Sequence, residues 1–131
     1  MKKLKKLLAV LLAVAAVCAL MVAPASAIST NCSGQGQDYN WSSSLTLNGN
    51  SATARMVVSA KPSGTVPAFL CAEVEGIIFD SRGGHSVISN SSGYITGQTA
   101  TAVGTAYISD AISATCGYYA QGAMVGSLKL P

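Results

Sequence analysis

The chain has 131 residues, of which only 10% are charged, and a formal net charge of +3. Four of its eight basic residues lie within the first six positions, and the four that remain face five acidic residues, a net charge of −1. A nearly neutral chain with scattered cations lacks the basic surface that nucleic acid or anionic lipid requires. We therefore expect neither of these as a partner.

The first 27 residues have the pattern of a secretory signal peptide. Four lysines precede an uncharged apolar run at 7–23, Pro24 ends that run, and Ala25-Ser26-Ala27 forms a small-residue cleavage site. An uncleaved membrane anchor is the alternative, because the run approaches the length that spans a bilayer. The proline and the cleavage site favour removal after Ala27. The prediction is a bacterial protein that is secreted or cell-wall associated, with no membrane span after cleavage.

Residues 28–38 are predicted to be a polar N-terminal arm without regular structure, since Gln35 and Gln37 alternate with glycines. Residues 39–131 are predicted to form a single β domain. A cleaved chain of about 100 residues is long enough to bury one core.

The clearest local signal is a hairpin. Apolar and polar residues alternate over 39–47 and again over 51–60, and Asn48-Gly49 lies between them. Alternation predicts half-buried strands, and Asn-Gly is typical of a two-residue turn with positive φ. We therefore expect Gly49 in the left-handed region.

The segment 68–80 predicts a central strand. Leu70, Ala72 and Val74 share one face, Cys71 lies on the opposite face, and Gly76 suggests a bulge. Shorter alternation predicts further strands at 85–88 and 94–109, and one long strand over 112–130 that bends at Gly122 and Gly126. Turn signals at roughly ten-residue spacing predict an all-β fold, a small antiparallel β-sandwich or partly open barrel of six to seven strands.

Three cysteines remain after cleavage, and export permits a disulfide. We expect Cys32 and Cys71 to pair, with Cys116 reduced and buried, although the other two pairings stay open. The odd count leaves one thiol free or available for an intermolecular bond.

The chain offers few groups for catalysis. His85 is the only histidine, and no nucleophile elbow accompanies it. Glu73 and Glu75 lie about 7 Å apart on one strand face, a spacing that would suit a glycosidase pair or a calcium ion. A solvated outer face explains them more simply. We therefore expect no enzyme, no catalytic or metal residues and no cofactor.

Aromatic residues give the remaining candidate site. Tyr39, Trp41 and Tyr119 could face a ligand and stack on sugar rings. The alternation of Trp41 with Leu45 and Leu47 favours the core instead.

The sequence thus predicts a non-enzymatic binding or structural module with an unidentified extracellular or cell-surface partner. A secreted bacteriocin-like antagonist is the first alternative, a carbohydrate-binding module the second and a hydrolase the last. Self-association through an edge strand is a further hypothesis, because 94–109 has neither charge nor proline. The competing interpretation is that this segment is paired on both sides.

Overall fold

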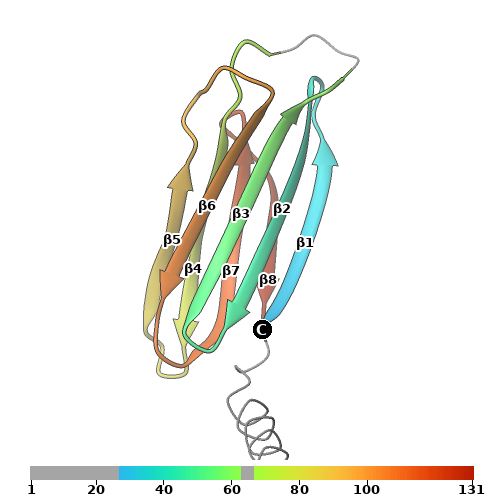
Figure 1. Ribbon diagram of the computed structural model, residues 1–131. Helices are drawn as coiled ribbons and strands as arrows, with labels where there is room; N and C mark the ends of the chain where they lie inside the picture. The colour runs from blue at the N-terminus through green and yellow to red at the C-terminus, as the bar shows by residue number, and fades with distance from the viewer. Residues whose placement is uncertain (1–26, 63–66) are drawn as a thin grey trace, which may run out of the picture.

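The computed structural model describes residues 27–62 and 67–131, in which the chain folds into a sandwich of two four-stranded sheets (Figure 1). The predicted signal segment before Ala27 lies outside the described residues. The strands are β1 Ile28–Gln35, β2 Tyr39–Asn48, β3 Ser51–Ala60, β4 Ala72–Asp80, β5 His85–Ser91, β6 Thr99–Tyr107, β7 Ala111–Ala120 and β8 Ala123–Leu130. The all-β sandwich is confirmed, with eight strands rather than six or seven. Within the described ranges, no helix is long and apolar enough to cross a bilayer.

The first sheet has the order β1-β2-β3-β6 and the second has the order β5-β4-β7-β8. All neighbouring strands are antiparallel. The sheets stack face to face with their strands roughly aligned (Figure 1). This leaves four edge strands, β1 and β6 in one sheet and β5 and β8 in the other.

Strand β1 corrects the prediction of an irregular arm. It pairs with β2 along its whole length, from Ile28 opposite Leu47 to Gln35 opposite Asn40. Its inward positions include Thr30, a cysteine and a glycine, so the strand has no apolar face. Hydrophobic alternation therefore gives no signal, although β2 supplies backbone partners along one edge of the strand.

Strands β7 and β8 correct the prediction of one long strand. The chain reverses at Gln121 and Gly122, whose φ angles of +54° and +82° fit a tight two-residue hairpin. A register shift between Tyr118 and Tyr119 displaces the alternation. The apolar alternation therefore continues across the turn in the sequence, which is why one long strand was predicted.

The β2–β3 hairpin is confirmed, but its turn differs from the one expected. Asn48 pairs with Ser51, so Gly49 and Asn50 are the turn residues. Neither belongs to the residues with positive φ. The Asn48 side-chain oxygen accepts hydrogen bonds from the backbone N–H groups of Asn50 and Ser51 at 3.2 and 3.1 Å. The expectation of a left-handed Gly49 was wrong, because this side chain stabilises the turn instead.

Strand β4 is the predicted central strand, with Ala72, Val74 and Ile78 fully buried. Gly76 is not a bulge, since the register with both neighbours continues through it. A Cβ at this position would collide with the carbonyl oxygen of Thr115 on β7. The glycine therefore permits a close approach of two backbones.

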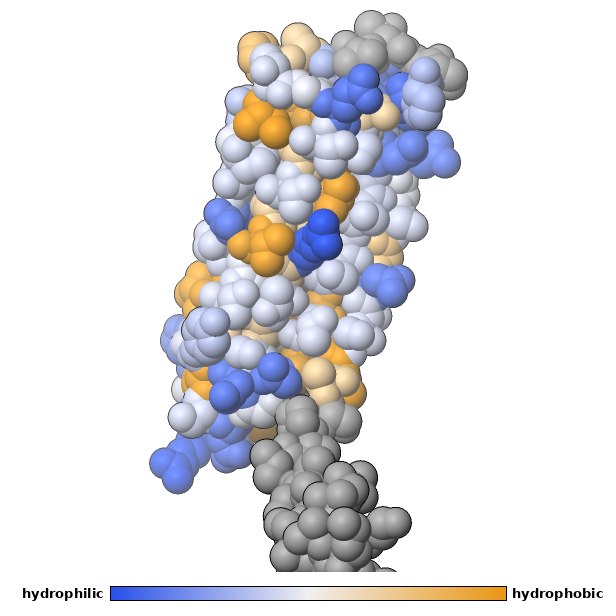
Figure 2. Space-filling model, viewed as in Figure 1, coloured by the Kyte–Doolittle hydropathy of each residue, from blue (hydrophilic) through white to orange (hydrophobic). Residues whose placement is uncertain are grey.

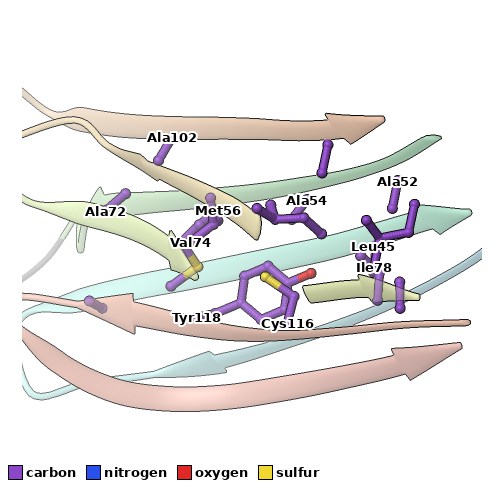
Figure 3. Close-up of a cluster of buried hydrophobic side chains, with 14 of the residues drawn as sticks. Leu45, Ala52, Ala54, Met56, Ala72, Val74, Ile78, Ala102, Cys116 and Tyr118 are labelled. Carbon is purple, nitrogen blue, oxygen red and sulfur yellow. The ribbon is translucent and has the colours of Figure 1, made fainter. Parts of the chain in front are cut away.

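The core lies between the sheets (Figure 3). Large buried side chains from both sheets fill it, among them Leu45, Met56, Val74, Ile78 and Tyr118. The inward positions of β3 and β6 are mostly alanines.

The segment 94–109 lies at an edge. Its strand β6 pairs with β3 and with no other strand of its sheet, so the interpretation that it is paired on both sides was wrong. Self-association through this segment stays a prediction.

A polar hollow around Arg55 as the candidate binding site

The outer face of the first sheet carries mostly small polar side chains. Strand alternation buries one set of residues and directs the other to solvent. The outward set is Ser29, Asn31, Ser33 and Gln35 on β1, Asn40, Ser42, Ser44 and Thr46 on β2, Thr53, Arg55, Val57 and Ser59 on β3, and Thr99, Thr101, Val103, Thr105 and Tyr107 on β6. Figure 2 views this face, where the pale colours of weakly polar residues dominate.

Near the middle of this face the surface is hollowed. The Arg55 hollow has a volume of about 370 Å³ and is lined by Asn31, Ser42, Ser43, Ser44, Arg55 and Val57. The register explains it, because Ser44 lies between Asn31 on one side and Arg55 on the other. The short side chain of Ser44 thus stands between two longer ones, and Ser42 stands beside the longer side chain of Val57.

Two hydrogen bonds from below fix the floor of the hollow. The hydroxyl of buried Tyr118, on the opposite sheet, donates to the carbonyl oxygen of Ser44 at 2.7 Å. The hydroxyl of Ser43, which is 4% exposed, donates to the carbonyl oxygen of Cys32 at 3.2 Å. The backbone under the hollow is therefore held in place before any ligand arrives.

The Tyr118 hydroxyl is suited to this role. Burial raises the pKa of Tyr118 far above its ordinary value, and the nearby thiols of Cys116 and Cys32 raise it further. The side chain therefore stays protonated at any physiological pH and remains a hydrogen-bond donor to the floor.

Arg55 is exposed and is the only formally charged residue on this outer face. Within the described residues no carboxylate lies at ion-pair distance from its guanidinium. The acidic side chains Glu73 and Glu75 belong to β4, in the other sheet. Five guanidinium N–H donors are thus available to a ligand, beside the hydroxyl and amide groups of the hollow.

The predicted aromatic residues do not form one surface. Trp41 is half-buried against the core, where Gly34 and Gly126 leave room for its ring. Tyr39 also packs against the core and lies over Gly36. Tyr119 is half-buried on β7, in the other sheet. The core interpretation of Trp41 is confirmed.

Other aromatic side chains are more exposed than those predicted. Phe69, Tyr94 and Tyr107 are 52%, 62% and 73% exposed. Tyr107 alone of these lies on a strand of the hollowed sheet, at the end of β6.

The structure does not contain the predicted disulfide between Cys32 and Cys71. All three described cysteines are free thiols. Cys32 lies on β1, where its sulfur is 3.1 Å from the Ser43 hydroxyl. Cys71 was expected to point outward but is buried, and its thiol donates to Glu73 at 3.3 Å. Cys32 therefore lies in the first sheet and Cys71 directly before β4 of the second sheet, and the two sulfurs have different partners.

The two buried thiols are poor nucleophiles. Burial raises the pKa of Cys71, and its hydrogen bond to Glu73 raises the pKa further. Burial likewise raises the pKa of Cys116, which lies between the sheets as predicted. A thiol with a raised pKa stays protonated near neutral pH, whereas nucleophilic attack requires the thiolate.

Glu73 and Glu75 lie on the outer side of β4, as predicted, with Glu73 half-buried and Glu75 exposed. Their cross-strand neighbours on β7 are Tyr119 and Gly117. Among the described residues, no three histidine, cysteine or acidic side chains are grouped to hold a metal ion.

His85 is exposed at the start of β5. The neighbouring carboxylate of Asp80 is engaged in the turn before β5, where it accepts from the backbone N–H groups of Arg82 and Gly84. Asp80 also borders a small hollow of about 150 Å³, where Ser81 donates to Asp110 at 2.7 Å. These contacts stabilise two turns.

Sequence reasoning missed the Arg55 hollow. The available signal was a single charge among outward-facing serines and threonines over 51–60. The hollow itself depends on three strands in register, and one of them was not predicted to be a strand.

No family model matches the chain, and no curated protein is similar enough to name as a relative.

Proposed function

We propose that the protein is an exported, non-enzymatic binding module whose Arg55 hollow takes an acidic sugar, a polyhydroxylated unit that carries a carboxylate, sulfate or phosphate group. The observation that carries this proposal is the unpaired guanidinium of Arg55 within a hollow of hydroxyl and amide groups. Arginine matches the geometry of such anions because its planar donors bind two oxygens at once.

The remaining lining fits the hydroxyl groups of a sugar. Ser42 and Ser44 each offer a donor and an acceptor, and Asn31 offers an amide with both. Val57 adds a small apolar contact. The volume of the hollow lies within the range of small-molecule sites, and its open rim would let a longer saccharide continue over the polar face.

Several features support binding without catalysis. The buried thiols stay protonated, His85 lies on the second sheet, and no acidic residue lines the hollow. The hollow therefore offers recognition groups without a general base or a nucleophile.

Titration of ¹⁵N-labelled protein with an oligogalacturonate tests the proposal, and the methyl-esterified form of the same saccharide provides the uncharged control. Sulfated and phosphorylated oligosaccharides are titrated in parallel. We expect chemical-shift changes at Asn31, Ser42, Ser44 and Arg55 with at least one acidic saccharide, and much weaker changes with the ester.

Arg55→Gln should weaken this binding at least about tenfold, since a charge-assisted hydrogen bond is lost. Arg82→Gln changes an exposed arginine of a distant turn and should leave the affinity unchanged. Failure of all three acidic saccharides to shift the hollow, or equal affinity of Arg55→Gln and the unaltered protein, would contradict the proposal.

A further inference from the structure

The backbone groups along β1 are not fully paired, and the β2–β3 hairpin shows which ones remain. The residues that flank a two-residue turn, here Asn48 and Ser51, exchange hydrogen bonds. Alternation then directs the backbone groups of odd-numbered β2 residues toward β1. Ser43 is one of them, and it lies opposite Cys32. Even-numbered residues of β1 therefore bond to β2.

The odd-numbered residues of β1 consequently turn their N–H and C=O groups away from the sheet. These residues are Ser29, Asn31, Ser33 and Gln35. No side chain of the described residues hydrogen-bonds to these outward groups. They form an open edge of eight donors and acceptors.

The other edge of the same sheet is partly closed. On β6 the outward carbonyl oxygen of Val103 accepts from the amide of Asn90 at 2.6 Å, and that of Tyr107 accepts from the hydroxyl of Ser86 at 3.0 Å. Both donors belong to β5, the nearest edge strand of the second sheet. An added strand on β6 would have to displace these bonds.

The edge of β8 is less favourable for another reason. It carries Lys129, and its pairing with β7 shifts register between Tyr118 and Tyr119. Charge and bulges are the usual protection of edge strands. Strand β1 has no charged side chain, no proline and an unbroken register with β2.

We propose that β1 pairs with β1 of a second copy of this chain, antiparallel about a twofold axis, so that the two first sheets become one continuous eight-stranded sheet. A second copy fits because the edge is complementary to itself. No side chain of the strand is charged. The α-amino group that cleavage after Ala27 leaves on Ile28 lies at opposite ends of the antiparallel pair in the two copies, so no like charges meet.

The pairing rules select one register. Outward groups bond only to outward groups, so odd-numbered residues must lie opposite odd-numbered residues. The register that uses all of them places Ser29 opposite Gln35 of the second copy and Asn31 opposite Ser33 of the second copy. Cys32 then lies opposite its own counterpart in a pair without backbone hydrogen bonds, the closer kind, with a Cα separation of about 4.5 Å.

That separation lies within the range of a disulfide. With glutathione disulfide as oxidant, the two Cys32 thiols would lose two protons and two electrons and form one S–S bond. The S–S bond of glutathione disulfide would accept these electrons and protons and break, and its two halves would leave as glutathione thiols. Cys71 and Cys116 are buried within each copy, so only Cys32 is placed to bridge two copies.

The first test measures association of the reduced protein by sedimentation. Ser33→Pro removes an outward N–H that makes no bond within the sheet, so the monomer should keep its fold while losing the dimer contact. Thr101→Pro makes the same change at an outward position of β6. We expect dimers for the unaltered protein and for Thr101→Pro, and monomers for Ser33→Pro, with unchanged far-ultraviolet circular dichroism.

The second test starts from the unaltered protein, so its main result does not depend on a variant that could misfold. The protein is oxidised with glutathione disulfide, and mass spectrometry of its peptides locates the bridge. We expect one intermolecular Cys32–Cys32 bridge, and Cys32→Ser should dimerise without becoming covalently linked. A monomer at the highest soluble concentration, a dimer that survives Ser33→Pro, or oxidation that yields no such bridge would overturn the proposal. This inference is independent of the acidic-sugar proposal, whose failure would appear only in the titrations.

Discussion

The two long sides of the sandwich are closed in different ways. On the β5/β6 side, polar side chains of one sheet hydrogen-bond to the edge carbonyls of the other. Gly104 allows this approach, since a Cβ there would lie 3.0 Å from methyl groups of Ile88 and Val74. On the β1/β8 side, the indole of Trp41 fills the space between Gly34 of β1 and Gly126 of β8.

The difference shows how closure of a side affects the edge beside it. Polar side chains that bond to edge carbonyls close a side and also occupy the groups that another strand would use. An aromatic ring closes a side by packing alone and leaves the edge backbone unpaired. The β1/β8 side is therefore where we expect both the larger packing energy and the contact with a second copy.

The largest effect should come from Trp41→Ala. Loss of the indole leaves a void between two glycines that cannot fill it, and we expect the free energy of unfolding to fall by about 3 kcal/mol. Urea denaturation measures the change. Tyr107→Ala removes an aromatic ring that is 73% exposed and should cost less than about 0.5 kcal/mol. Equal losses for the two variants would mean that Trp41 does not hold the β1/β8 side.

A smaller effect should come from Asn90→Ala on the β5/β6 side. The variant loses the amide that donates to Val103 and the oxygen that accepts from the N–H of Ser91. We expect a loss of about 1 kcal/mol in urea denaturation. The carbonyl of Val103 also becomes free, so self-association at high concentration should increase.

Asn40→Ala is the control, since it removes an exposed amide of β2 that forms no hydrogen bond with the described residues. An Asn90→Ala protein that is less stable yet associates no more than the control would show that the amide does not protect the β6 edge.

The contrast between the two sides also explains which parts of the fold the sequence could predict. Strands β2 and β3 alternate between apolar and polar residues, so their inward sets were predicted correctly from 39–47 and 51–60. Strand β1 has no apolar face to bury, because Trp41 of the neighbouring strand fills the space beneath it. Local alternation cannot detect a strand when the apolar side chain beneath it belongs to the neighbouring strand.

The same limit applies to the candidate site. The outward positions of β2 and β3 could be predicted, but the hollow exists because β1 places Asn31 in register with Ser44 and Arg55. Cross-strand register depends on tertiary pairing. The cysteine prediction failed for a related reason, since Cys71 is buried against Glu73 and Ser91 rather than turned to solvent.

The smallest effect is expected for Gly49→Ala, which provides a reference for the glycines that line the two sides. Gly49 lacks a positive φ, and a Cβ there would meet no atom within 4 Å. Alanine also restricts the unfolded chain, so the free energy of unfolding should stay within about 0.5 kcal/mol of the unaltered protein or rise slightly. Gly126→Ala should instead lose more than about 1 kcal/mol, because its Cβ would lie 2.9 Å from the Cη2 atom of Trp41. Thermal and urea denaturation of both variants measure these changes in the free energy of unfolding. A loss above about 1 kcal/mol for Gly49→Ala would mean that the hairpin needs a left-handed residue at this position after all.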